Sequence, residues 1–188
     1  MGDRGISVDH SSIDAWINKF SPQIEKLVRQ RKKRTGKKWR MDETYVKVKG
    51  KWKYLYRAVD EYGHTIDFLL TAKRDAKAAI RFLKKAVKSN DIPNKIYIDK
   101  SGANKKAIED FNEENDLEIE IKQSKYMNNI VEQDHRGIKR PSKHRQFYRE
   151  FHAGHKKIRG IESVRMIYKG QVKGISSVGE FFRELIAA

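Results

Sequence analysis

Three carboxylate residues stand at points where the chain is expected to pass through or leave a regular element. Asp42 lies within an expected strand, Asp99 ends a short apolar strand, and Glu132 falls in the first turn of an expected helix. Carboxylates that converge repel one another unless a cation neutralises them, and Mg²⁺ accepts such ligands while leaving positions for phosphate oxygens. Two such ions can activate a nucleophile and stabilise the leaving oxygen of a phosphodiester. The pattern therefore indicates metal-dependent chemistry at phosphorus.

Each carboxylate also has a structural interpretation when it is taken alone. Asp42 can be a partly buried or solvent-facing strand residue, and Asp99 can cap the helix that follows it. Glu132 stands three residues after Asn129, which is the capping-box position. Singly, none of the three predicts an active site.

The segment around Glu132 favours the chemical interpretation. In YMNNIVEQDHRGIKR, Arg136 and Lys139 follow Glu132 by four and seven residues, on the same helix face. A carboxylate followed by two cations suits a metal-bound phosphodiester with flanking phosphates, and Arg140 can join that surface. The alternative is one ion pair on a solvated helix face, which stabilises by about 0.3–0.5 kcal/mol.

The surrounding pattern predicts an α/β fold with a mixed five-stranded sheet and flanking helices. Apolar residues alternate in the strands and recur at helical spacing in the helices. The expected elements are strands at 38–48, 52–60 and 64–71, a helix from Asp75 to Asn90, a strand at 95–99, a helix from Ser101, a strand at 117–121, and a helix from Asn128 or Asn129 to about Arg140, stopped by Pro141. Parallel strands need helical crossovers, so the first and fourth strands can be neighbours and can bring the carboxylates together.

The two ends of the chain are predicted to be helical. A first helix is expected at 12–20, capped by Ser11 or Ser12, and a second from Ser21-Pro22 to about Arg29. Residues 31–38 are predicted to be a solvated basic linker, because they are rich in Lys and Arg and lack apolar side chains. The catalytic core is expected at 39–142, and a basic helical tail at 143–188.

The composition points to a polyanionic partner. Lys and Arg total 42 against 25 Asp and Glu, so the net charge is +17, which favours nucleic acid, with an anionic membrane as the rival. No apolar run reaches the roughly 20 residues of a membrane span, and the N-terminus lacks a signal peptide, so we expect a soluble intracellular protein. Without cysteine, any metal must be held by carboxylate or histidine, which favours hard cations.

Several other signals are given structural interpretations. Three histidines of the basic tail lack a carboxylate at ligand spacing and are not predicted to bind metal: His144, His152 and His155. Four aromatic residues of the expected strands are predicted to pack in the core rather than stack on bases: Trp52, Tyr54, Tyr56 and Phe68. No Gly-rich phosphate loop occurs, so nucleotide hydrolysis is not indicated.

Three segments of the chain closely resemble the DDE transposases of the insertion-sequence-six family. They are WRMDETYVKVKGKWKYLYRAVDEYGHTIDFLL, IYIDKSGANKKAI and YMNNIVEQDHRGIKR, within a match from about Trp39 to Gln171. The resemblance implies an RNase H-like, retroviral-integrase-like core with Asp42, Asp99 and Glu132 as its metal-binding triad for two Mg²⁺ or Mn²⁺ ions. It also implies cleavage at element ends, strand transfer into target DNA, and contact of Arg136 and Lys139 with the element end.

The same resemblance sets expectations for partners and for the chain's N-terminal part. We expect double-stranded DNA as substrate, a homo-oligomer on DNA, no membrane, and a bacterial cytoplasmic, nucleoid-associated location. Asp99 and Glu132 stand 33 positions apart, slightly closer than expected for the family. Residues 1–30 resemble the second half of a helix-turn-helix, so the first helix is expected to leave its apolar face partly exposed in an N-terminally truncated copy. The alternatives are an inactive remnant, a nuclease that cuts without joining, and a DNA-binding protein without catalysis.

Overall fold

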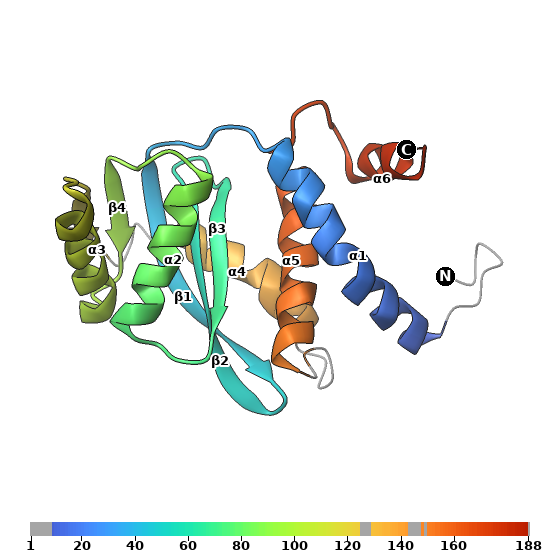
Figure 1. The fold of residues 1–188 in the computed structure, drawn as a ribbon, viewed down its shortest axis with the longest axis horizontal. Coiled ribbons are helices and arrows are strands. Elements are labelled where there is room, and N and C mark those ends of the chain that lie inside the picture. Colours follow the sequence, from blue (N-terminus) through green and yellow to red (C-terminus); the bar gives the residue numbers. More distant parts are fainter. Residues whose placement is uncertain (1–8, 125–128, 143–147, 149, 188) are drawn as a thin grey trace. The chain divides into compact units, whose positions relative to one another are not determined.

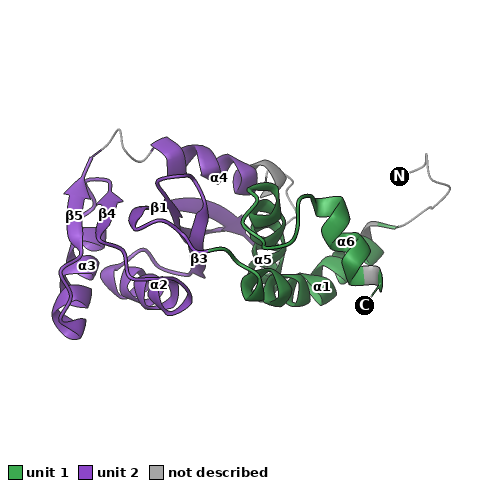
Figure 2. Ribbon diagram, turned by 90° about the horizontal axis from the view of Figure 1, so that it is seen from above, with its two compact units in different colours: residues 1–33, 148–188 green, residues 34–147 purple. Residues whose placement is uncertain are grey.

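The computed structural model describes residues 9–124, 129–142, 148 and 150–187 (Figure 1). The chain forms two compact units, one of residues 34–147 and the other of residues 1–33 with 148–188 (Figure 2). The sequence did not predict that the first helix and the C-terminal helices share a unit. Among the described residues, no helix is both long and apolar enough to cross a membrane.

The unit of residues 34–147 is built on the expected mixed sheet of five strands. The strands are β1 (Lys38–Val48), β2 (Lys51–Asp60), β3 (Thr65–Thr71), β4 (Lys95–Ile98) and β5 (Glu120–Gln123). Their order is β3-β2-β1-β4-β5, with β1 antiparallel to β2 and parallel to β4. The predicted contact between the first and fourth strands is therefore confirmed.

A two-residue turn joins β1 to β2. Lys49 and Gly50 both have positive φ, 47° and 77°, as a type I′ turn requires. The turn fixes the register in which Tyr45 lies opposite Tyr54 and Asp42 opposite Arg57.

Helices cover both faces of this sheet. Helices α2 (Ala76–Ser89) and α3 (Gly102–Asn115) lie on one face, and α4 (Asn129–Ser142) packs on β1 and β2 from the other (Figure 2). Asp75 and Ser101 cap α2 and α3, as predicted, and each side chain accepts a backbone N–H. The main apolar core includes Trp39, Phe82 and Ile108.

Two predicted boundaries of this unit are wrong. The fifth strand begins at Glu120, because the side chain of Asn112 already bonds the backbone N–H and C=O of Ile119, at 3.2 and 3.0 Å. Pro141 does not stop α4, which ends at Ser142; near the helix end a missing N–H disrupts few bonds. The possible cap Asn128 lies outside the described residues.

The unit of residues 1–33 and 148–188 has one N-terminal helix, so the prediction of two helices there is wrong. A single helix, α1 (His10–Gln30), runs through Pro22 and is capped by Asp9 rather than by Ser11 or Ser12. It packs on α5 (Phe151–Tyr168), with Ser21 meeting Gly160. This packing offsets the hydrogen bond that proline removes, since tertiary contacts routinely outweigh helix propensity.

The second apolar core forms where α1, α5 and α6 (Val178–Ala187) meet. It includes Ile24, Val28, Met166 and Phe181. The expected exposure at the start of α1 is confirmed, because Trp16 is 51% and Phe20 41% exposed. The apolar face of α1 is thus buried at its C-terminal half and open at its N-terminal half.

The basic segment after α1 has an ordered backbone. The N–H of Lys33 donates to the C=O of Gln171 and the N–H of Lys173 to that of Arg31, both at 2.8 Å. Further along, the N–H of Gly36 donates to the carboxylate of the buried Asp60, at 2.8 Å. The lysine and arginine side chains of this segment are largely exposed, whereas its backbone is held by hydrogen bonds at both ends.

Candidate active site

Asp42 lies on β1, and Asp99 directly follows β4, the strand that runs parallel beside β1. The paired register of the two strands ends with Arg40 opposite Tyr97, two residues before Asp42 on one strand and two before Asp99 on the other. The Asp99 carboxylate also accepts the N–H of Ser101, at 3.0 Å. Asp99 therefore shapes the turn before α3, but the N-cap of that helix is Ser101 rather than Asp99, so the alternative prediction that Asp99 caps the helix is wrong.

Glu43 has a different role from its neighbour Asp42. Successive strand residues face opposite sides of a sheet, and the Glu43 carboxylate pairs with Arg74 and accepts from the amide of Asn104, at 2.8 Å. Burial raises the pKa of Glu43, and the carboxylates of Asp42 and Asp99 raise it further, against the lowering effect of Asn104 and Arg74. Asp42 and Asp99 thus both lie close enough to Glu43 to affect its ionisation.

Helix α4 is attached to the sheet through a buried polar network. Nε2 of His135 lies 3.0 Å from Oδ2 of Asp42, and its Nδ1 lies 3.3 Å from a guanidinium nitrogen of Arg57. Arg57, fully buried on β2, donates to Asp134 at 2.5 Å. Burial lowers the pKa of His135, and the hydrogen bond to Asp42 opposes that shift. The network fixes α4, and Glu132 with it, relative to Asp42.

Asp42 and Glu132 line one cavity of about 610 Å³ together with Arg136 and Lys139. The side chains of Glu132, Arg136 and Lys139 are exposed, so they can meet a ligand. Asp99, the residue after β4, is not among the residues that line this cavity. The side chain of Arg140 lies outside the described residues.

The donor set suits a hard divalent cation, but the ligands are not gathered. Within the part of the chain that the structure describes, no three His, Asp or Glu side chains lie close enough together to hold a metal ion. Carboxylate oxygens are the ligands that Mg²⁺ and Mn²⁺ prefer. Like charges repel one another, so a metal site built from Asp42, Asp99 and Glu132 would need these side chains to draw together around the cation.

Sequence reasoning missed the residues that support the carboxylates. Arg57 carried a signal, because it is a charged residue inside an otherwise apolar stretch, YLYRAV. A buried charge needs a partner, and Asp134 is that partner. His135 stands within the EQDHR segment three residues after Glu132, but its contact with Asp42 depends on how α4 packs against β1.

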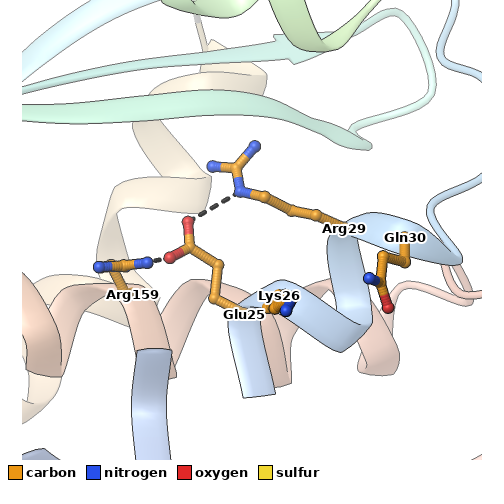
Figure 3. A pocket seen from close by; sticks show the side chains of 5 residues that line it. All are labelled: Glu25, Lys26, Arg29, Gln30 and Arg159. Atoms are coloured by element: carbon orange, nitrogen blue, oxygen red, sulfur yellow. Dashed lines mark hydrogen bonds and ion pairs between the residues drawn. The ribbon is translucent and has the colours of Figure 1, made fainter. Parts of the chain in front are cut away.

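A second cavity, of about 460 Å³, lies in the unit of residues 1–33 and 148–188 (Figure 3). Its centre is Glu25, which pairs with Arg29 at 2.8 Å and with Arg159. One carboxylate between two guanidiniums links α1 to α5. The arrangement holds two helices together and brings no second carboxylate to the cavity.

Comparison with known structures identifies the fold as that of retroviral integrase catalytic cores. The core of HTLV-2 integrase in complex with magnesium, in its trimeric form, matches with a TM-score of 0.56 and 17% identity, over 71% of this chain and 88% of the other. The core of BIV integrase matches with a TM-score of 0.55 and 15% identity, over 81% and 95%. The chain thus contains the RNase H-like fold, with its mixed five-stranded sheet in the unit of residues 34–147.

Sequence comparison gives the family. A family model described as a DDE domain matches residues 36–171. The transposase of the insertion sequence-like element IS431mec from Staphylococcus aureus strain Mu50 is 35% identical over 183 residues, 95% of this chain and 79% of that protein. The transposase of insertion sequence IS257 in transposon Tn4003, also from Staphylococcus aureus, is 36% identical over 94% and 78%. The chain belongs to the insertion-sequence-six family of DDE transposases, which are enzymes of DNA transposition.

Proposed function

We propose that Asp42, Asp99 and Glu132 are the metal-binding carboxylates of a reaction that cleaves DNA at element ends and joins the freed 3′ ends to target DNA. The observation that supports this most is the parallel pairing of β1 and β4, in which Arg40 lies opposite Tyr97, two residues before Asp42 and Asp99. Glu132 adds to it by lining one cavity with Asp42. Two divalent ions bound there would activate the attacking oxygen and stabilise the leaving one.

Basic residues of α4 position the DNA. Arg136 and Lys139, which line the cavity, bind the phosphates that flank the reacting one, and Arg140 is proposed to join them. His135 holds one oxygen of Asp42 in a fixed direction. The Arg57–Asp134 pair keeps α4 on the sheet, which holds Glu132 at the cavity.

The setting of the reaction follows from the same proposal. The +17 net charge favours double-stranded DNA as the partner, and the work of joining two element ends favours a homo-oligomer assembled on DNA. The place of action is then the bacterial cytoplasm, at the nucleoid.

Strand transfer from a labelled duplex with a candidate element end, in Mg²⁺ or Mn²⁺, tests the proposal. Wild type should give joined product, and Asp42→Asn, Asp99→Asn and Glu132→Gln should give none while binding DNA as well as wild type. Asp110→Asn is the matched control, because Asp110 is a carboxylate on α3 that pairs with Lys106. Joined product from all four variants would refute the assignment. Cleavage without joining would indicate a nuclease instead.

A further inference from the structure

The β1–β2 hairpin carries an exposed aromatic surface, which contradicts the prediction that Trp52 packs in the core. Trp52 is 60% and Tyr45 46% exposed, and their rings meet edge to face with centroids 6.3 Å apart. The ring of Tyr54 lies beside that of Tyr45, at 5.2 Å, and Nζ of Lys47 lies 5.6 Å from the centroid of Trp52. These four residues are called the aromatic–lysine patch.

Strand register explains why the patch is continuous and open. Tyr45 pairs with Tyr54, and Lys47 pairs with Trp52, so all four side chains share one face. The ladder to β3 begins only at Tyr54, and the ladder to β4 ends at Arg40. The end of the hairpin therefore reaches past the strands on both sides, and Figure 1 shows it extending beyond β3.

The positive charge of the hairpin indicates which kind of partner it binds. The sequence has no acidic residue from 44 to 59. The tip of the hairpin carries four lysines, Lys47, Lys49, Lys51 and Lys53. A second copy of the hairpin would bring like charges together, which is unfavourable. The same positive charges attract a polyanion. The exposed aromatic rings favour a polyanion that also has flat rings on which they can stack.

The patch also adjoins the candidate active site. Tyr45 lines the same cavity as Asp42 and Glu132, so a DNA strand that leaves the cavity on this side runs along the hairpin. Bases within a duplex are stacked on both faces, and an exposed ring can stack only on a base that is unpaired or turned out of the helix.

We propose that the aromatic–lysine patch binds an unpaired base of the DNA strand beside the reacting phosphodiester, with Trp52 stacking on the base, Tyr45 supporting the Trp52 ring edge to face, and Lys47 contacting the phosphate of that base. The inference rests on the proposed function, since it assumes that DNA occupies the cavity. It adds a base-stacking site outside the carboxylate cavity.

Tryptophan fluorescence can test this without any catalysis. The chain has three tryptophans, and Trp39 is only 1% exposed, so a Trp16→Phe chain leaves Trp52 as its one exposed tryptophan. With Asp99→Asn added and divalent metal absent, we would titrate it with an element-end duplex that has a short single-stranded overhang, and with a blunt duplex of equal phosphate number. The overhang should quench the emission more strongly than the blunt duplex.

Affinity measurements complete the test. Trp52→Ala should weaken overhang binding about tenfold, as expected for one lost base stack, and should change blunt-duplex binding less than twofold. Tyr62→Ala, which removes a 74% exposed tyrosine from the β2–β3 turn, should change neither. Equal losses on both DNAs, or no loss on either, would refute base stacking.

Three outcomes decide the fate of this inference, and the last two separate it from the proposed function. A change in the sedimentation of Trp52→Ala without DNA would make the patch an interface between copies and overturn the inference. Normal strand transfer by wild type with no overhang-specific quenching would overturn the inference alone. Overhang-specific quenching in a chain that joins no DNA would support the patch and count against the proposed chemistry.

Discussion

Nε2 of His135 lies 3.0 Å from Oδ2 of Asp42, so a helix residue holds a strand carboxylate by one of its two oxygens. The ring is 5% and the carboxylate 15% exposed. On its other side the ring meets Arg57, which is itself fixed by Asp134. Any change to this contact therefore acts on the carboxylate proposed to bind metal and on the packing of α4.

Replacing His135 is expected to weaken metal binding. His135→Ala removes the group that orients Asp42, and losses of about tenfold to a hundredfold in metal affinity are typical when such a partner is removed. His135→Gln can keep one hydrogen bond and should recover part of the affinity. Mn²⁺ binding followed by electron paramagnetic resonance measures this directly. His64→Ala, in the β2–β3 turn, is the control, and equal affinity in all four proteins would contradict the expected role.

Loss of Arg57 is expected to destabilise the unit of residues 34–147. Arg57→Met removes one partner of a buried ion pair, and such a change costs about 3 kcal/mol or more because the remaining charge stays buried. The double variant Arg57→Met, Asp134→Asn should be less destabilised than the sum of the single variants. Urea unfolding of wild type, the two single variants and the double variant completes a double-mutant cycle. Strictly additive losses in the free energy of unfolding would show that the pair does not interact.

Gly160 is expected to be required where α5 crosses α1. A Cβ at position 160 would lie 3.0 Å from Cβ of Ser21 and still closer to its hydroxyl. Gly160→Ala should therefore cost about 1–3 kcal/mol through overpacking, and Ser21→Gly should restore part of the loss. Gly179→Ala on α6, where an added Cβ meets nothing closer than 4.0 Å, is the control. Thermal unfolding that is unchanged by Gly160→Ala would rule out this close approach.

Tyr56 is expected to make the fold sensitive to alkali. Burial raises its pKa to about 12, and the nearby Glu43 adds to that shift. The unfolded chain loses this proton near pH 10 while the folded chain keeps it, so the free energy of unfolding should fall as pH rises from 10 towards 12. Tyr56→Phe cannot ionise and should show a shallower fall than wild type in urea unfolding between pH 9 and 11. The exposed Tyr62→Phe should behave like wild type.

The sequence by itself determined the order of the elements from β1 to α4 and placed the three carboxylates within or next to them. Strand and helix periods depend on local alternation, so β1, β4, α2 and α3 were predictable close to their observed bounds. The neighbouring position of β1 and β4 followed from that order, because a parallel strand must return through a crossover helix. The family resemblance was equally local, since it rests on short segments around each carboxylate.

Tertiary structure alone decided what each side chain meets. Pro22 is a local signal for a helix start, yet the packing of α1 on α5 carries one helix through it. Trp52 lies in a strand pattern that predicts a core residue, but it is exposed because the β1–β2 hairpin extends beyond the end of β3. Arg57, Asp134 and His135 become one network only when α4 lies on β1 and β2. Such contacts join residues far apart in the chain, and no local pattern specifies them.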